Sequence, residues 1–218
     1  MHPIPVTGPF EKLGIDLVGP LPVITNGNRY IVVAIDYLTK WAEARAIPNS
    51  SAQAIVPFIH EDIICRHGFP KEIILDRGTT FVNEVIQELC ERTKIKHRLS
   101  APYHPQTNRL VEKLNRTLCT SLSKYVQIYK KDWDHYLPTV LLAYRTMKQS
   151  TTQFEPFYLT YSRQVITPFD LSLEVPNNSK LTIEQQIVQR ACSIIDKLEF
   201  DREIALHNIQ KAQQKQKK

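Results

Sequence analysis

The sequence predicts an α/β fold with five strands and three helices in the order β-β-β-α-β-α-β-α, followed by additional C-terminal helices. Two observations support this fold class. Residues 11–18, 30–36 and 41–47 carry the alternating or β-branched pattern of strands. From residue 50 onward, stretches of helical period alternate with short apolar runs. At 218 residues, the chain is long enough for one core of roughly 150 residues plus appendages.

Short connections join the first three predicted strands. Between the first and second strands, the segment "GPLPVITNGNR" contains a Gly-Pro pair and an Asn-Gly pair, and Asn-Gly is a strong hairpin signal. The turn "YLTK" separates the second strand from the third. We therefore expect these three strands to form an antiparallel meander.

The pattern then changes to helical spacing. Residues 50–68 begin with serine, end with glycine and predict a helix. Pro57 lies inside this segment, and an interior proline costs about 3 kcal/mol, so we expect a kink or a late helix start. Two further strands and two further helices follow: strands at 71–75 and 95–99, and helices at 82–93 and 106–127.

The C-terminal third is predicted to be mainly helical. Residues 133–146 form an amphipathic pattern with Leu137, Leu141 and Tyr144 on one side. Residues 164–180 resemble a loop, and residues 181–211 contain neither glycine nor proline, which favours one long helix. We expect a core domain over 3–165, a linker over 166–180, and a C-terminal helix with a basic tail over 181–218.

Composition limits the classes of protein. The formal net charge is +6 and the pI about 9.1, which favours a polyanionic partner. There is no run of about 18 apolar residues and no secretory signal pattern, so we expect no membrane association. The four cysteines are scattered without a CxxC pair, which is typical of reduced intracellular thiols and predicts neither a disulfide scaffold nor a zinc site.

Three carboxylates occupy notable positions. Asp16 lies inside the first strand, Asp76 at the exit of the fourth, and Glu112 early on the third helix, with 35 residues between the last two. Taken singly, a strand-end aspartate commonly caps a turn, and a helical glutamate is commonly solvated. Carboxylates that converge, however, repel one another unless divalent cations lie between them. Two such ions, about 3.5–4 Å apart, catalyse phosphodiester chemistry in many enzymes.

The helix face around Glu112 is suited to nucleic acid. Residues three and four positions apart share a helix face, which surrounds Glu112 with amides and guanidinium groups: Asn108, Arg109, Asn115 and Arg116. Arginine is the side chain whose planar donors fit phosphate best. The sequence contains no competing motif such as a Gly-rich phosphate loop, G-x-S-x-G or HExxH.

Five separated motifs follow one another along the chain: "GIDLVGPLP", "YIVVAIDYLTKWAEARAIP", "ILDRGTTF", "HPQTNRLVEKLNRTL" and "WDHYLPTVLLAYRT". Together they resemble the catalytic core of retroviral and long-terminal-repeat retrotransposon integrases, most of all the Ty3/gypsy type. The resemblance covers roughly residues 3–165. It implies a ribonuclease-H-like fold with a mixed five-stranded sheet.

The resemblance also implies the site. Asp16, Asp76 and Glu112 match a catalytic triad that holds two Mg²⁺ or Mn²⁺ ions. Four further positions match residues that meet DNA ends: Tyr103, Gln106, Asn108 and Arg116. Asp36 is a rival on sequence alone, but the resemblance places it in the turn after the second strand, with a structural role.

The implied activity is DNA integration, with 3′-end processing followed by strand transfer into target DNA. The implied partners are double-stranded DNA, as element ends and as target, and further copies of the chain. We expect an intracellular protein that is nuclear when it acts. Two alternatives stay open: a catalytically impaired, element-derived DNA-binding protein, and a simple nuclease on the same fold.

The sequence departs from the family pattern in several places. Arg109, Gln153 and Ser162 occupy positions where the family usually has glycine. We expect the fold to persist, whereas Arg109 places a large cation beside the predicted metal site and bears on catalytic efficiency. His60, Cys65 and His67 are too few and unsuitably spaced to replace the family's His₂Cys₂ zinc domain, so we assign them to a core helix.

Overall fold

The computed structural model describes residues 8–75, 84–99, 109–126, 132–166 and 197–215. The chain divides into two compact units between Arg145 and Thr146, and each is described by itself. The first unit contains the sheet and the helices up to α5. The second contains helices α6 and α9.

The first unit is built on a mixed five-stranded sheet, as predicted. The strand order is β3-β2-β1-β4-β5. Strands β1 and β2 pair antiparallel, as do β2 and β3, which confirms the predicted meander, whereas β4 and β5 run parallel to β1. The strands are β1 (Lys12–Val18), β2 (Tyr30–Asp36), β3 (Ala42–Ile47), β4 (Glu72–Leu75) and β5 (Lys96–Leu99).

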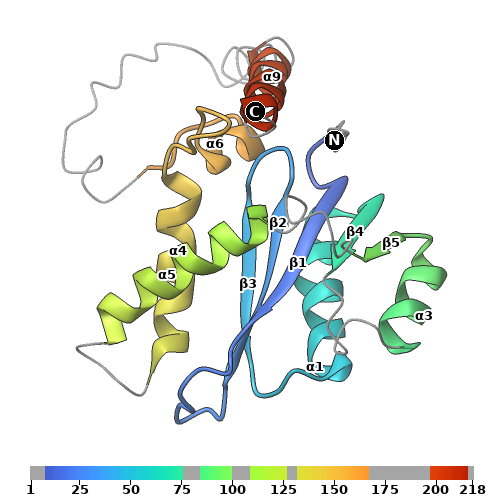
Figure 1. Ribbon diagram of the computed structural model, residues 1–218, viewed down its shortest axis with the longest axis vertical. Helices are drawn as coiled ribbons and strands as arrows, with labels where there is room; N and C mark the ends of the chain where they lie inside the picture. The colour runs from blue at the N-terminus through green and yellow to red at the C-terminus, as the bar shows by residue number, and fades with distance from the viewer. Residues whose placement is uncertain (1–7, 76–83, 100–108, 127–131, 167–196, 216–218) are drawn as a thin grey trace, which may run out of the picture. The chain divides into compact units, whose positions relative to one another are not determined.

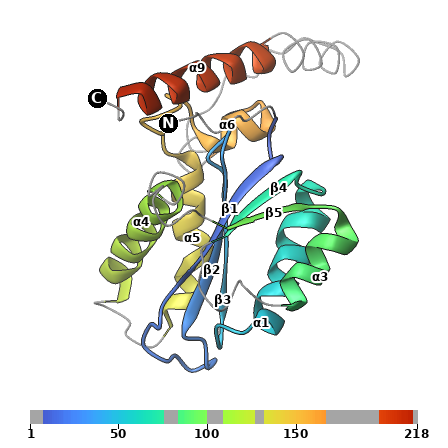
Figure 2. The same cartoon turned by 45° about the vertical axis from the view of Figure 1, so that its right-hand side comes forward.

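Helices cover both faces of the sheet (Figure 1). One face carries α1 (Ala52–Pro57) and α3 (Glu84–Thr93), and the opposite face carries α4 (Arg109–Val126) and α5 (Trp133–Thr146). Figure 2 shows the same three layers after a turn of 45°. This arrangement explains why the central strands are apolar on both sides, since each side is buried beneath a helical layer.

Two apolar cores result from the strict alternation of strand β2. Val32 and Ala34 pack toward α1 and α3, whereas Ile31, Val33 and Ile35 pack toward α4 and α5. The side chains that α5 contributes to the second core include the three predicted from the sequence: Leu137, Leu141 and Tyr144.

Pro57 marks a change of helix type. The segment predicted as one helix over 50–68 begins as α1 after Ser51 and continues from Phe58 as the π-helix η1 (Phe58–Ile64). It ends in the short helix α2 (Cys65–His67). The predicted kink therefore takes the form of a wider helical turn directly after the proline, whose missing N–H and ring disfavour regular α-helix.

In the second unit, polar contacts join helix α9 (Glu199–Lys215) to Thr152, Tyr158 and Leu159. Tyr158 Oη donates to Asp201 Oδ2 at 2.6 Å, and Arg202 donates from two nitrogens to the Leu159 carbonyl. Burial and the bond to Asp201 raise the pKa of Tyr158 to about 12. Residues 199–211 of the predicted long helix are helical, and α6 (Pro156–Tyr161) is a helix that the sequence analysis did not anticipate.

Two of the positions at which the sequence replaces a family glycine have left-handed backbone. The φ angles are 65° at Gln153 and 56° at Ser162, where Ser162 ends helix α6. We therefore expect Ser162→Gly to stabilise the second unit by about 0.5–1 kcal/mol, because glycine adopts this conformation without strain. Hydrogen-exchange protection of the α6 amides would measure the gain. Ser162→Ala is the matched control, and an equal gain in that variant would refute the backbone explanation.

The composition predicted no disulfide scaffold and no membrane span. Cys65, Cys90 and Cys119 form no disulfide with one another, and Cys192 lies outside the described residues. Within the part of the chain that the structure describes, no helix has the length and apolar character to cross a membrane.

Candidate active site

Strand β1 directs Asp16 toward the face covered by α4. Leu13 and Ile15 belong to the core beneath α1 and α3, so the alternate residues Gly14 and Asp16 face the other way. The register agrees, since Asp16 pairs with Val33, which packs in the core on the α4 side.

Gly14 allows helix α4 to approach β1 closely. A Cβ atom built at Gly14 would lie 2.7 Å from Val111 Cγ2 and 3.2 Å from the Tyr37 ring. Any side chain here would push against the buried Val111. The absence of a side chain at Gly14 therefore helps to set the position of the helix turn that carries Glu112.

We expect Gly14→Ala to destabilise the first unit by about 1–3 kcal/mol through this steric conflict. Urea unfolding would measure the loss. Val111→Ala removes the opposing Cγ2 atom, so Gly14→Ala should cost less in that background, by about 1 kcal/mol or more. Strictly additive effects of the two substitutions would contradict this origin for the close approach.

A direct hydrogen bond joins α4 to Asp16. Asn115 Nδ2 donates to Asp16 Oδ2 at 2.7 Å, and the Leu17 N–H donates to Oδ1 at 2.8 Å. Glu112 lies three residues before Asn115 on α4 and is exposed, so the two side chains share a helix face. The structure therefore brings the helix face that carries Glu112 to Asp16. The sequence analysis placed Asn115 on this face but did not identify its bond to the strand.

Several of the remaining predicted site residues lie outside the described residues. Strand β4 runs parallel beside β1 and ends at Leu75, the residue before Asp76. Asp76 itself lies outside the described residues, as do three of the predicted DNA-contact residues: Tyr103, Gln106 and Asn108. Among the described residues, no group of three His, Cys, Asp or Glu side chains could hold a metal ion. Of the three predicted carboxylates, Asp16 and Glu112 are among the described residues, and Asp76 is not.

Two arginines flank Glu112 on the exposed side of α4. Arg109 is the first residue of the helix, and Arg116 lies one turn after Glu112; both are exposed. Glu112 in the first turn interacts favourably with the helix dipole, whereas a cation at Arg109 does not. The arrangement presents positive charge on both sides of the carboxylate.

Asp36, the rival carboxylate, is a turn anchor. It is fully buried, and its oxygens accept hydrogen bonds from the Phe10 N–H at 3.1 Å and from the Thr39 N–H and hydroxyl at 2.8 and 2.7 Å. Burial raises the pKa of Asp36, and the two bonds from Thr39 and the charge of Lys40 oppose that rise. The contacts fit the structural role expected for Asp36.

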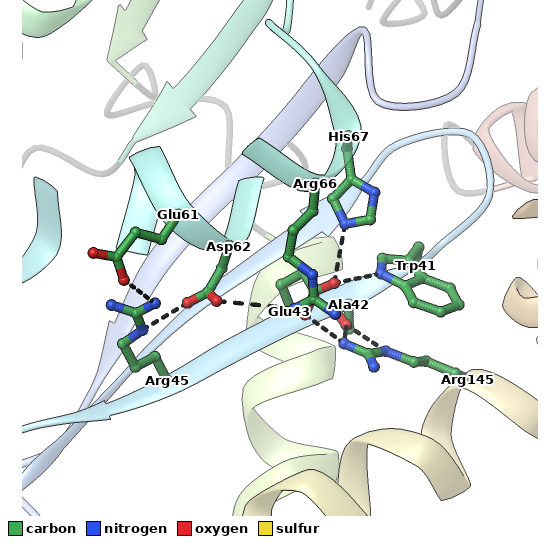
Figure 3. Close-up of polar contacts among 9 residues, drawn as sticks. All are labelled: Trp41, Ala42, Glu43, Arg45, Glu61, Asp62, Arg66, His67 and Arg145. Carbon is green, nitrogen blue, oxygen red and sulfur yellow. Dashed lines mark hydrogen bonds and ion pairs between the residues drawn. The ribbon is translucent and has the colours of Figure 1, made fainter. Parts of the chain in front are cut away.

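A second cluster of charged side chains surrounds Glu43 on strand β3 (Figure 3). Four side chains donate to its two carboxylate oxygens: Trp41, Arg66, His67 and Arg145. Trp41 Nε1 and His67 Nε2 lie 2.9 and 3.0 Å from Oε1. Arg145 Nη2 and Arg66 Nη1 lie 2.5 and 3.3 Å from Oε2. Sequence reasoning did not predict this cluster, because its members are far apart along the chain.

The Glu43 cluster ties strand β3 to helices α2 and α5. Arg145, near the end of α5, also donates to the Ala42 carbonyl at 2.7 and 2.8 Å, and its guanidinium lies 4.2 Å from the Trp41 ring centroid. Burial raises the pKa of Glu43. The hydrogen bond from His67 and the charge of Arg145, with smaller contributions from Trp41 and Arg66, outweigh burial, so the net effect is a lowered pKa. The carboxylate is therefore an ionised, satisfied structural group.

Comparison with known proteins decides the family. Residues 6–105 match the family model described as "Integrase core domain". The chain carries an integrase core domain. The matched residues include Asp16 and Asp76 of the candidate site and end before helix α4.

Proteins similar to this integrase core include a Pol polyprotein and an integrase-like protein. Over 154 residues, or 71% of this chain, it is 36% identical to the "Retrovirus-related Pol polyprotein from transposon 412" of Drosophila melanogaster. Over 167 residues, or 77% of this chain, it is 29% identical to the "Gypsy retrotransposon integrase-like protein 1" of Bos taurus. The chain spans only 12% of the first relative and 33% of the second.

A solved structure supports the same fold. The chain superposes with a TM-score of 0.61 and 23% sequence identity on a chain in the structure titled "CryoEM structure of simian T-cell lymphotropic virus intasome in complex with PP2A regulatory subunit B56 gamma". The match covers 73% of this chain and 57% of that chain. The predicted ribonuclease-H-like α/β fold is confirmed by this likeness and by the strand order.

Proposed function

We propose that this integrase core joins DNA strands by phosphoryl transfer. It would trim the 3′ end of an element's double-stranded DNA and then direct the freed 3′ hydroxyl against a phosphodiester of target DNA. The integrase core family supports DNA integration in general. The metal-dependent steps, the DNA ends and a multimeric working form belong to the proposal.

The observation that carries the proposal is the bond between Asn115 and Asp16. This 2.7 Å contact connects the acidic residue of β1 to the helix face that presents Glu112. Asp76 follows directly after β4, the parallel neighbour of β1, and carboxyl ends of adjacent parallel strands lie at the same edge of a sheet. We infer that Asp16, Asp76 and Glu112 act together.

The chemistry of two described side chains, Asp16 and Asn115, supports a hard divalent cation in this proposal. Asn115 Oδ1 is buried and has no hydrogen-bond partner among the described residues, and it belongs to the side chain that contacts the Asp16 carboxylate. Carboxylate and amide oxygens are suitable ligands for Mg²⁺ or Mn²⁺. In the proposal Asp16, Asp76 and Glu112 hold two such ions. When bound, the ions would neutralise the carboxylates and stabilise charge that develops on the phosphoryl group.

The chain's own residues supply positioning. The hydrogen bonds from Asn115 and Leu17 fix the orientation of the Asp16 carboxylate. Arg116 is exposed on the same helix face and would donate to a DNA phosphate. Because phosphate contacts position DNA without reading bases, we expect slight sequence preference at the target.

A strand-transfer assay with the full chain and a labelled blunt DNA duplex tests the proposal. We expect products longer than the substrate in Mg²⁺ or Mn²⁺ and none in the presence of a chelator. Shorter fragments without longer products would support the nuclease alternative. A gel shift that is insensitive to chelator, without joined or cut products, would support the DNA-binding alternative.

A further inference from the structure

A hollow of about 750 Å³ lies at the edge of the sheet beside strand β5. Helix α3 forms one side, and residues 94 and 95 together with most of β5 form the rest. None of the lining residues belongs to the site proposed above, and the proposed phosphoryl transfer does not use the hollow. Its size is within the range of about 300–1,000 Å³ that is typical of ligand sites.

The backbone of β5 is oriented for further strand pairing. Lys96 N–H donates to the Lys71 carbonyl at 3.0 Å, and Lys96 and Arg98 lie opposite Glu72 and Ile74 of β4. In a parallel ladder, alternate residues of an edge strand direct their N–H and C=O groups to the neighbour. The backbone groups of His97 and Leu99 therefore point away from β4, and no described strand pairs with that side of β5.

The lining of the hollow combines apolar and cationic groups. Cys90 and Ile95 are only 3% and 5% exposed and give it an apolar floor. His97 Nε2 is buried and has no hydrogen-bond partner among the described residues. Burial lowers the pKa of His97, so its ring is neutral near pH 7. Lys94 and Arg98 add positive charge to the lining, where Arg98 Nε pairs with Glu72 Oε1 at 3.1 Å, and Glu91 adds a negative charge.

Lys94 has an unusual backbone conformation for a lysine. Its φ angle is 56°, directly after α3, and the next residue closes the helix through a bond from the Ile95 N–H to the Cys90 carbonyl at 2.9 Å. Glycine is the residue that favours this position, and another residue costs about 1 kcal/mol. Backbone strain of this kind is often retained where a side chain has a function.

We propose that this edge binds an extended, acidic peptide segment of a partner protein. The segment lies beside β5 as a sixth strand and exchanges main-chain hydrogen bonds with His97 and Leu99. An apolar side chain enters the hollow beneath α3, and neighbouring carboxylates meet Lys94 and Arg98. In this mode of recognition, main-chain bonds supply affinity and alternate side chains supply specificity.

The charge of the edge strand disfavours self-association, and the geometry of its backbone disfavours nucleic acid. Basic side chains on an edge strand, here Lys96 and Arg98, discourage pairing with a second copy of the same strand. A nucleic acid has no extended amide backbone to match His97 and Leu99.

Fluorescence anisotropy of a labelled, N-acetylated peptide of alternating Glu and Val, titrated with the full chain, tests the proposal. We expect saturable binding, with NMR shifts of the His97 and Leu99 amides. The same peptide with Lys in place of Glu, or with N-methyl groups on the edge that faces β5, should bind at least about tenfold more weakly. Equal binding of either control peptide, or no binding of the acidic peptide, would overturn the proposal.

Lys94→Gly separates binding from folding. Because glycine relieves the left-handed strain, this variant should be at least as stable as the wild type, yet bind the acidic peptide roughly threefold to tenfold more weakly. Ser162→Gly is the control, with a similar backbone gain and unchanged peptide binding. Unchanged peptide binding by the Lys94→Gly variant would overturn the assignment. Displacement of the peptide by duplex DNA from the wild type but not from Lys94→Gly would also overturn it.

Discussion

Glu112→Gln is expected to reduce strand joining about a thousandfold, which corresponds to a loss of about 4 kcal/mol of transition-state stabilisation. Glutamine keeps the size of the side chain but removes the charge that would hold a cation near Asp16. Glu112 is exposed on α4, so the substitution should leave the unfolding free energy within about 0.5 kcal/mol of the wild type. Single-turnover strand transfer and urea unfolding would measure the two effects.

Glu84→Gln provides the matched control for this experiment. Glu84 is also an exposed glutamate in the first turn of a helix, α3, and the proposal gives it no role. Joining should be unchanged in that variant. Equal joining by wild type and Glu112→Gln would remove Glu112 from the catalytic proposal, whatever the behaviour of Asp16.

Glu43→Gln is expected to lower the unfolding free energy by about 3 kcal/mol or more. Glu43 is only 4% exposed and binds two arginines and a histidine, so loss of its charge leaves the Arg145 guanidinium without its buried partner. Denaturant unfolding at pH 7 would measure the loss. The matched control is Glu61→Gln, because Glu61 pairs with Arg45 at an exposed site and should contribute less than about 1 kcal/mol.

The Glu43 effect should depend on pH. The folded-state pKa of Glu43 is lowered, so its charge stabilises the fold fully above the unfolded value near 4.5. This contribution is lost as the pH falls through the lower folded value. The difference in stability between wild type and Glu43→Gln should therefore shrink below about pH 4. A difference that stays constant down to pH 3 would contradict the ionic origin of the effect.

The hydrophobic periodicity of the sequence predicted most strands and helices of the first unit, because each element has the period typical of its type. The β-branched run over 30–36 coincides with β2, and the amphipathic pattern over 133–146 coincides with α5. The apolar residues of these elements are buried because helical layers cover both faces of the sheet. Periodicity indicates which face of an element is apolar, and in these elements the apolar face is the buried one.

Other features depend on contacts between distant residues and could not be predicted. The bond from Asn115 to Asp16 joins residues 99 positions apart, and the bond from Arg145 to Glu43 joins residues 102 positions apart. The requirement for glycine at Gly14 becomes visible only when Val111 lies against it. At Pro57 the sequence predicted a disturbance, but it did not predict that the segment after the proline would form the π-helix η1.

The most direct test of the central claim is the location of bound cations in crystals of the full chain soaked in Mn²⁺ and measured for anomalous scattering. We expect anomalous peaks within bonding distance of the carboxylates of Asp16, Asp76 and Glu112. Crystals in which these three side chains point apart, with manganese bound only elsewhere, would contradict a shared metal site.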